Sequence, residues 1–308
     1  TMSYIGTTKN DSWPANTVQD VSMSGFDRIQ LCAGFRDVLV KFNDPRLEVW
    51  FNKARTQIKV STQYPENDIV VNNVRYLRPE YLAAKNMVIY NPSTWVEDVK
   101  AGKTLVDTAR FVGMPIASST GDGSSYNLNP NPVQGGPNVH NSALDDIYKA
   151  AKGTLLKARM ISYAEVCFIM AEASRKGWSV GGTQKEWYEK GVKASMDTWG
   201  VGSAYAAYIA QPGVAFDGTL AQIITQKWIA NWTVAHEAWC DWRRTGFPTL
   251  AIGPKALRDA MPLRFEYGPN EKGRNNANYK VAIERLVETP FTATDGKDSS
   301  WSKFWLLQ

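Results

Sequence analysis

The sequence predicts a mainly α-helical fold with long irregular loops and a few short β-hairpins. Apolar residues recur at helical spacing over residues 160–176 and again over 183–199, which is typical of helices that bury one face. Residues 86–140 are instead rich in Gly, Pro, Ser and Asn, a composition typical of loops. Because 308 residues with 44% hydrophobic content are enough for a large core, the chain could form one broad domain or two closely merged ones. Of these we predict a single domain over residues 1–308.

The N-terminal part of the sequence is predicted to pass from a loop into a helix and then into strands. Residues 1–25 are polar, whereas apolar residues recur at helical spacing over residues 25–41. An Asn-Asp-Pro turn follows, in which we predict that Asp44 forms the turn and that Arg46 is an ion-pair anchor. Alternating apolar residues over 50–78 predict short antiparallel strands or hairpins.

Residues 43–145 form a loop-rich region that we predict to face a ligand. Its least regular part, residues 86–140, places aromatic rings beside amides, hydroxyls and a carboxylate, and loops of this length are usually functional or disordered. Rings stack on the C–H faces of sugars, and planar polar side chains bond sugar hydroxyls. Carbohydrate binding is therefore one interpretation, and simple packing of the loops on a helical body is the other. The candidate ligand-binding residues are Trp13, Tyr90, Trp95, Asp122, Tyr126 and Asn127.

Residues 155–245 are predicted to form a helical core. Gly177 ends the first of the two amphipathic helices, as a C-terminal glycine cap does. Small residues in both helices permit close approach, and the pair resembles a degenerate tetratricopeptide repeat. A short helix over 205–209 and one long helix over 219–244 are predicted to follow.

The C-terminal segment, residues 246–308, begins where Gly246 and Pro248 stop the long helix. The end of that helix and the following MPLRFEYGPNE stretch are dense in Trp, Arg and acidic residues. Such a composition predicts a buried, paired polar network that fixes the arrangement of elements more than it adds stability. A last helix over 279–286 and an apolar tail that docks on the body complete the prediction.

Composition and charge argue against several classes of function. The net charge is +5, and the basic residues are scattered rather than clustered with aromatic residues, so no nucleic-acid binding is expected. Two histidines cannot form a His-rich metal site, and we expect no cofactor. Cys32, Cys167 and Cys240 lack a paired spacing, and we predict that Cys167 and Cys240 are small core residues. No apolar run reaches the roughly 18 residues that span a bilayer.

Catalysis by a pair of carboxylates is not expected. The acids that lie close in sequence are Glu237 with Asp241, and Glu266 with Glu271. Each pair has an arginine nearby, which keeps both acids ionised instead of raising one pKa. The sequence also lacks the G-x-S-x-G, H-E-x-x-H and C-x-x-C motifs. We therefore predict a binding protein and not an enzyme.

Several linked motifs, in order, resemble the SusD/RagB-like nutrient-binding outer-membrane lipoproteins of Bacteroidetes. They are NDPRLEVWF from residue 43, ISYAEVCFIMAEASRKG from 161, YEKGVKASMDTWGV from 188, and WCDWRRTGFP from 239 with PLRFEYGPNE after it. The resemblance marks a set of structural signature residues, which are Asp44, Arg46, Glu165, Glu172, Trp239, Asp241, Arg243, Arg244, Arg264, Tyr267 and Glu271.

This resemblance implies a SusD-like scaffold of tetratricopeptide-type helices and a place on the outer face of the outer membrane. It also implies that an N-terminal part with a lipid anchor is missing from this chain. The ligand would be an oligosaccharide or, less often, a peptide, which is passed to a SusC-type TonB-dependent transporter. A helical-repeat scaffold for protein partners, with no small ligand, is the alternative, and a glycoside-acting enzyme is a third hypothesis.

Overall fold

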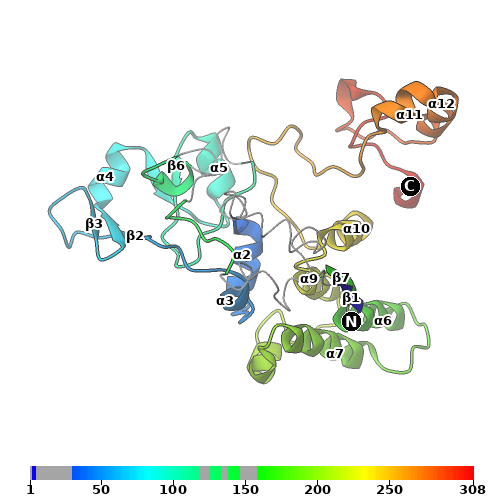
Figure 1. Cartoon of the computed structure of the whole chain (residues 1–308), viewed down its shortest axis with the longest axis horizontal. Coiled ribbons are helices and arrows are strands. Elements are labelled where there is room, and N and C mark those ends of the chain that lie inside the picture. Colours follow the sequence, from blue (N-terminus) through cyan, green and yellow to red (C-terminus); the bar gives the residue numbers. More distant parts are fainter. Residues whose placement is uncertain (1, 5–29, 118–124, 133–137, 146–157) are drawn as a thin grey trace.

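The computed structural model describes residues 2–4, 30–117, 125–132, 138–145 and 158–308 (Figure 1). Within these residues helices predominate, and the strands form small sheets of two or three strands each. Figure 1 places a loop-rich part with two of the three small sheets at the left, packed helices at the lower right, and a C-terminal part at the upper right. The predicted mainly α fold with irregular segments and short β structure is therefore confirmed.

The helical body is built around the predicted helix pair, α6 (Tyr163–Arg175) and α7 (Gln184–Thr198). Thr183 begins α7 with a reciprocal capping box to Glu186, which satisfies backbone N–H groups that a helix start leaves free. Gly177 follows α6 with a φ of +83°, the left-handed conformation that favours glycine. Both helices therefore end within one residue of the predicted positions, whereas α6 begins three residues later than predicted.

A single long helix was predicted after residue 219, and this prediction is wrong. The chain forms α9 (Leu220–Ala230) and α10 (Ala235–Thr245), with a turn between them that the amide of Val234 closes on the carbonyl of Asn231 at 2.8 Å. Asn231 and the β-branched residues after it favour a turn over a continued helix. Because the apolar spacing continues across the turn, periodicity alone did not reveal the break.

The Asn-Asp-Pro turn lies between α2 (Ala33–Lys41) and α3 (Leu47–Trp50). The guanidinium of Arg46, which is completely buried, donates to Asp44 at 2.8 Å and to the hydroxyl of Ser195 on α7 at 2.7 Å. It also donates to the hydroxyl of Tyr208 on α8 (Tyr205–Ile209) at 3.1 Å. The predicted ion-pair anchor is confirmed, and it joins the turn to two helices far along the chain.

The predicted strands form a three-stranded sheet in the order β2 (Gln57–Val60), β4 (Val74–Leu77), β3 (Asp68–Val71). β3 and β4 make an antiparallel hairpin, and its turn residues Asn72 and Asn73 both have positive φ, a conformation that asparagine tolerates. β2 pairs with β4 in parallel. The expectation of antiparallel pairing is therefore right for the hairpin and wrong for β2.

Residues 79–106 contain more regular structure than the sequence predicted. A two-stranded parallel sheet joins β5 (Met87–Ile89) to β6 (Thr104–Val106), and α5 (Trp95–Lys100) connects them. α4 (Pro79–Ala84) precedes β5. The remaining short elements are β1 (Met2–Tyr4), which pairs with β7 (Ala158–Ile161), and the single turns η3 (Tyr126–Leu128) and η6 (Gly202–Ala204).

The C-terminal part consists of α11 (Pro269–Arg274), α12 (Asn276–Glu284) and the turns η7 (Ala293–Asp295) and η8 (Trp305–Leu307). A long irregular stretch connects it to α10 (Figure 1). The expected docking of the tail is wrong for its last residues, since Trp305 is 77% exposed and Leu306 is 55% exposed.

Three remaining observations bear on the composition-based predictions. Cys167 is buried as predicted, whereas Cys240 is exposed, because this position of α10 lies on its solvent side. Among the described helices, none has the length and apolar character that crossing a membrane requires. The described residues also hold no group of three or more potential metal-ligating side chains.

Candidate functional site

One side of α10 is joined to the helical body by a network of charges that is buried at Lys227, Glu165 and Asp241 and exposed at Arg244. Arg244 donates to both carboxylate oxygens of Glu172 on α6 and, at 2.8 Å, to Asp241 one turn earlier on its own helix. Lys227 on α9 contacts Asp241 at 2.7 Å and Glu165 on α6 at 3.9 Å. Five side chains with alternating charge therefore fix α6, α9 and α10 relative to one another.

The pKa values of the two glutamates reflect their different partners. Burial raises the pKa of the Glu165 carboxyl, and the charge of Lys227 opposes that rise. Burial alone would also raise the pKa of Glu172, but the hydrogen bonds and charge of Arg244 outweigh it, so this pKa is lowered. Glu165 and Glu172 join α6 to α9 and α10, and neither of them lines a described cavity.

The other side of α10 holds the irregular stretch that leads to the C-terminal part. The indole N–H of Trp239 donates to the carbonyl of Pro262 at 3.2 Å, and Arg243 donates to the carbonyl of Leu263 at 3.1 Å. The guanidinium of Arg243 lies 4.0 Å from the centroid of the Trp239 ring, a cation–π geometry. The Trp-Cys-Asp-Trp-Arg-Arg motif therefore contacts α6 and α9 from one side of α10, and residues 262–263 from the other side.

Two signature residues after α10, Arg264 and Tyr267, bind Asp298, a partner that the sequence did not predict. Arg264 is buried and pairs with Asp298 at 2.8 Å, and the amide of Tyr267 donates to the same carboxylate at 3.2 Å. The expected place of Glu266 and Glu271 in a buried network is wrong, because both residues are exposed. Asp298 lies in a polar stretch 34 residues from Arg264, and no local pattern links the two.

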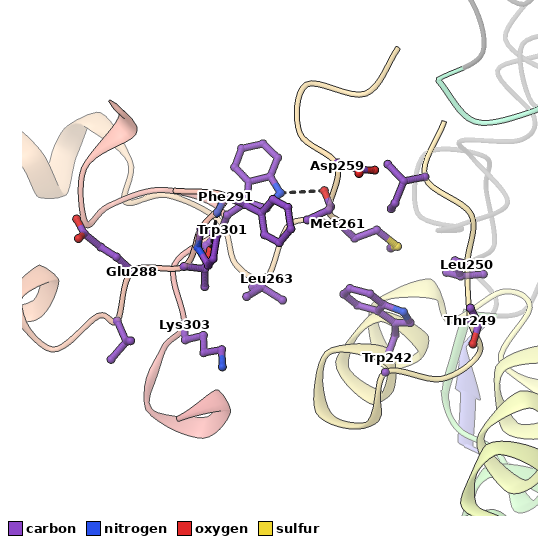
Figure 2. Close-up of a pocket in the computed structure, with 16 residues that line it drawn as sticks. Trp242, Thr249, Leu250, Asp259, Met261, Leu263, Glu288, Phe291, Trp301 and Lys303 are labelled. Carbon is purple, nitrogen blue, oxygen red and sulfur yellow. Dashed lines mark hydrogen bonds between the residues drawn. The ribbon is translucent and has the colours of Figure 1, made fainter. Parts of the chain in front are cut away.

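A cavity of about 560 Å³ lies between the end of α10 and the C-terminal part (Figure 2). We call it the C-terminal cavity. Figure 2 shows Phe291 and Trp301 on one side and Trp242 on the other, with Leu263 between them. Its lining residues are Trp242, Gly246, Thr249, Leu250, Ile252, Asp259, Ala260, Met261, Leu263, Val287, Glu288, Thr289, Pro290, Phe291, Trp301 and Lys303.

Specific contacts hold the aromatic walls of this cavity in place. The indole N–H of Trp301 donates to the carbonyl of Ala260 at 2.9 Å (Figure 2). Arg258 donates to the carbonyl of Phe291 at 3.2 Å, pairs with Asp295 at 3.1 Å, and lies 5.4 Å from the centroid of the Trp301 ring. These contacts join Arg258 and Ala260 to the segment from Phe291 to Trp301, on one side of the cavity.

The size and lining of the C-terminal cavity are those of a small-ligand site. Ligand pockets enclose about 300 to 1,000 Å³, with mainly apolar and aromatic walls and a few polar groups. Here the charged side chains of Asp259, Glu288 and Lys303 line the cavity from exposed positions. Aromatic walls with carboxylates and an amine at the rim can stack on a flat ring and bond hydroxyl groups around it.

Two of the predicted ligand-binding residues, Tyr126 and Asn127, line a smaller hollow of about 230 Å³ beside β6. The Asn127 side chain is nonetheless occupied within the protein. It accepts from the amide of Asp107 at 2.8 Å and donates to the carbonyls of Asp107 and His140 at 3.0 Å each. Tyr126 is half-buried, and burial raises the pKa of its hydroxyl. Asn127 therefore stabilises the contact of its own loop with Asp107 and His140.

The other predicted residues of this region do not form an exposed aromatic platform. Trp95 begins α5 and is 5% exposed. The hydroxyl of Tyr90 donates to Asp37 at 2.7 Å, and its ring lies 5.0 Å from the guanidinium of Arg36. The burial of Trp95 and the internal contacts of the half-buried Tyr90 argue against stacking on a ligand, so the binding role of this region stays a prediction. Trp13 and Asp122 lie outside the described residues.

Sequence reasoning missed the C-terminal cavity because its aromatic rings come from distant positions. Trp242 belongs to the helix motif, whereas Phe291 and Trp301 lie in a stretch with no helical or strand periodicity. The concentration of tryptophan and phenylalanine between residues 291 and 305 was the available signal. The apolar end of the chain predicts only a tail that packs on the body.

The fold and the cavity define a helix-rich protein with a ligand-sized aromatic site. A family model described as "SusD-like_2: Starch-binding associating with outer membrane" matches residues 113–268, which is about half of the chain. The chain therefore belongs to the SusD-like family. No curated protein sequence matches it.

Solved structures with the same fold include several SusD homologues. A chitin-binding homologue from Flavobacterium johnsoniae is 20% identical with a TM-score of 0.62, over 99% of this chain and 54% of the other. A homologue from Bacteroides uniformis is 19% identical with a TM-score of 0.61, over 99% and 55%. One from Bacteroides vulgatus is 22% identical with a TM-score of 0.57, over 92% and 50%. The chain thus spans about half the length of these proteins.

Proposed function

We propose that this protein binds an oligosaccharide in the C-terminal cavity, at the cell surface, and releases it unchanged. The observation that carries this proposal is the convergence of three aromatic rings, those of Trp242, Phe291 and Trp301, on a cavity of about 560 Å³ with charged groups at its rim. Pyranose rings present C–H faces that stack on such rings, and rim carboxylates accept hydrogen bonds from their hydroxyls.

The comparisons support a carbohydrate ligand over other nutrients. The family description names starch binding and association with the outer membrane, and two of the solved neighbours are described as chitin-binding. In the proposed role the ligand passes from this protein to a SusC-type TonB-dependent transporter, and a lipid-modified N-terminal part provides the membrane anchor. A peptide ligand, and a scaffold for protein partners with no small ligand, are the alternatives.

Binding without catalysis fits the environment of the acids. Asp241, Glu172 and Glu165 are engaged with Arg244 and Lys227 away from the cavity. The cavity acids Asp259 and Glu288 lie in exposed positions. An acid that donates a proton to a glycosidic bond needs a raised pKa, which usually comes from burial or a neighbouring like charge.

Calorimetric titration with a panel of glycans and peptides tests the proposal. We expect heat from at least one glycan. Phe291→Ala should weaken that binding about tenfold, because truncating an aromatic side chain at a site centre typically costs more than 1 kcal/mol. The matched control is Phe265→Ala, which removes an exposed ring outside the cavity.

Four outcomes would count against the proposal. Heat from peptides alone would favour the peptide-binding alternative. Co-purification with a large membrane protein, without heat from any small ligand, would favour the scaffold. Equal weakening by Phe291→Ala and Phe265→Ala would place the ligand elsewhere. Release of shortened glycans, detected by chromatography, would contradict binding without catalysis.

A further inference from the structure

One side of the helix α6 is in contact with solvent and carries no charge. Its side chains follow helical spacing, so they lie along one line of the helix. They are Tyr163, Val166, Ile169, Met170 and Ala173, and none of them is buried. The acidic residues of α6, Glu165 and Glu172, instead contact Lys227 on α9 and Arg244 on α10. The apolar line is therefore separate from the charge network of this helix.

Exposed apolar residues continue this line beyond both ends of α6. The amide of Trp178 donates to the carbonyl of Ala173 at 3.0 Å across Gly177, which is the bond of a Schellman motif. This motif commonly places the residue after the glycine against the last turn of the helix, and Trp178 is 67% exposed. On β7, directly before α6, Met160 is 66% exposed and Ile161 is 49% exposed. We call these three residues and the apolar line the uncharged face of α6.

The neighbouring helix α7 has a different outward side. Lys185 pairs with Glu189 at 3.8 Å, and Lys193 pairs with Asp197 at 2.7 Å, each four residues apart, as is typical of a helix side that faces water. The two helices lie side by side (Figure 1), and α6 also packs on α9. Because α6 already buries one side in these contacts, its uncharged face is additional apolar surface, which marks an interaction site.

The size of the uncharged face suits a weak contact between two proteins. Its exposed side chains are Met160, Ile161, Tyr163, Ile169 and Trp178. Two aromatic and three aliphatic side chains of this exposure offer on the order of 500 Å², which is at the upper end of the patches that monomeric proteins expose. A standard interface takes about 800 Å² from each partner. A contact through this face should therefore be reversible.

The face is also compatible with a second copy of itself. Since it holds no charge, no like charges meet when two such faces pack together. In a two-fold contact the same patch of both copies is used, and residues at opposite ends of the patch meet across the axis. An antiparallel arrangement of two α6 helices places Trp178 of each copy near Tyr163 of the other. Ile169, near the middle, then lies close to its own counterpart.

We propose that the protein forms a reversible two-fold dimer through the uncharged face of α6. The aromatic rings at its two ends anchor the contact, as large aromatic side chains do in many interfaces, and the aliphatic residues between them exclude water. The proposal is independent of glycan binding, because the C-terminal cavity shares no residue with this face.

Sedimentation velocity of the unmodified protein over the micromolar concentration range tests the proposal. We expect the fraction of dimer to rise with concentration. Ile169→Glu should raise the dissociation constant at least about tenfold, because two carboxylates would then meet near the axis. The matched control is Val281→Glu, which makes a similar change at an exposed aliphatic residue of α12 and should leave the dissociation constant unchanged.

A mixture of two variants tests the symmetry of the contact. Ile169→Lys should weaken self-association as Ile169→Glu does. An equimolar mixture of the two should associate at least about tenfold more tightly than either variant alone, because opposite charges then face each other across the axis. Circular dichroism verifies that both variants are folded. A mixture that associates no better than its components would contradict the two-fold arrangement.

Two further results would overturn the dimer. One is a single monomeric species over the whole concentration range, and the other is a dimer that folded Ile169→Glu leaves intact. If the monomer instead co-sediments with phosphatidylcholine vesicles and Ile169→Glu abolishes this, the uncharged face binds a lipid surface and not a second copy.

Discussion

The buried pair of Asp44 and Arg46 gives the most direct test of how this fold is held together. The substitution Asp44→Asn keeps the shape of the side chain and removes its charge. Arg46 is completely buried and cannot lose its proton in a protein, so its cation would remain without a counter-charge. Breaking a buried pair in this way costs about 3–5 kcal/mol, which is a large part of the roughly 5–15 kcal/mol by which a typical domain is stable.

The chain offers a matched control for this substitution. Asp197 pairs with Lys193 at 2.7 Å one turn apart on α7, and both side chains are about half exposed. Asp197→Asn therefore makes the same chemical change where water screens the charges, and we expect a loss of at most about 0.5 kcal/mol. Urea denaturation followed by circular dichroism measures both free energies of unfolding. If Asp44→Asn costs no more than Asp197→Asn, the buried pair does not anchor the turn.

Three further predictions concern packing and pH. Trp95→Ala should lower the free energy of unfolding by about 3–5 kcal/mol, because the side chain is buried, and should leave glycan affinity unchanged; a selective loss of affinity would restore this ring to the binding site. Gly113→Ala should cost about 1–3 kcal/mol, because the added Cβ would lie 2.6 Å from the backbone at the start of α2, whereas Gly268→Ala, with open space around it, is the control by thermal unfolding. The pKa of Glu172 is lowered in the folded state because Arg244 outweighs the effect of burial, so its contribution is present above the unfolded pKa and disappears as the pH falls through the folded one. The stability difference between wild type and Glu172→Gln should therefore shrink on acidification, and a constant difference in denaturation curves would contradict this.

Local patterns in the sequence predicted the elements that depend on local interactions. The spacing of apolar residues in α6, its terminal Gly177 and the capping residue Thr183 of α7 all correspond to contacts within a few residues. The turn that separates α9 from α10 contains neither glycine nor proline, so the strongest signals of a helix end were absent there. Helix boundaries are predictable when a cap marks them and are missed when only a turn does.

The candidate site was harder to predict because its geometry depends on contacts between distant residues. Aromatic residues in the loop-rich region satisfied the composition of a sugar site, but α5 turns Trp95 inward and Asp37 binds the hydroxyl of Tyr90. The rings that do line a large cavity are brought together by Arg258 and by the pairing of Val287 with Lys303. Composition shows which residues are available for stacking, whereas tertiary contacts decide which of them face a cavity.

The position of α10 explains how such a cavity keeps its shape with little regular structure around it. Trp242, which forms one wall, lies between Asp241, in the buried charge network, and Arg243, which binds the stretch at Leu263. Buried ion pairs with directional hydrogen bonds fix geometry more than they increase stability. One wall is therefore rigid, while the facing wall comes from irregular segments joined through Arg258 and Trp301. In the proposed role, transfer of the ligand to a transporter would require moderate affinity, since slow dissociation would limit transfer. A site with one fixed wall and one irregular wall would meet that requirement.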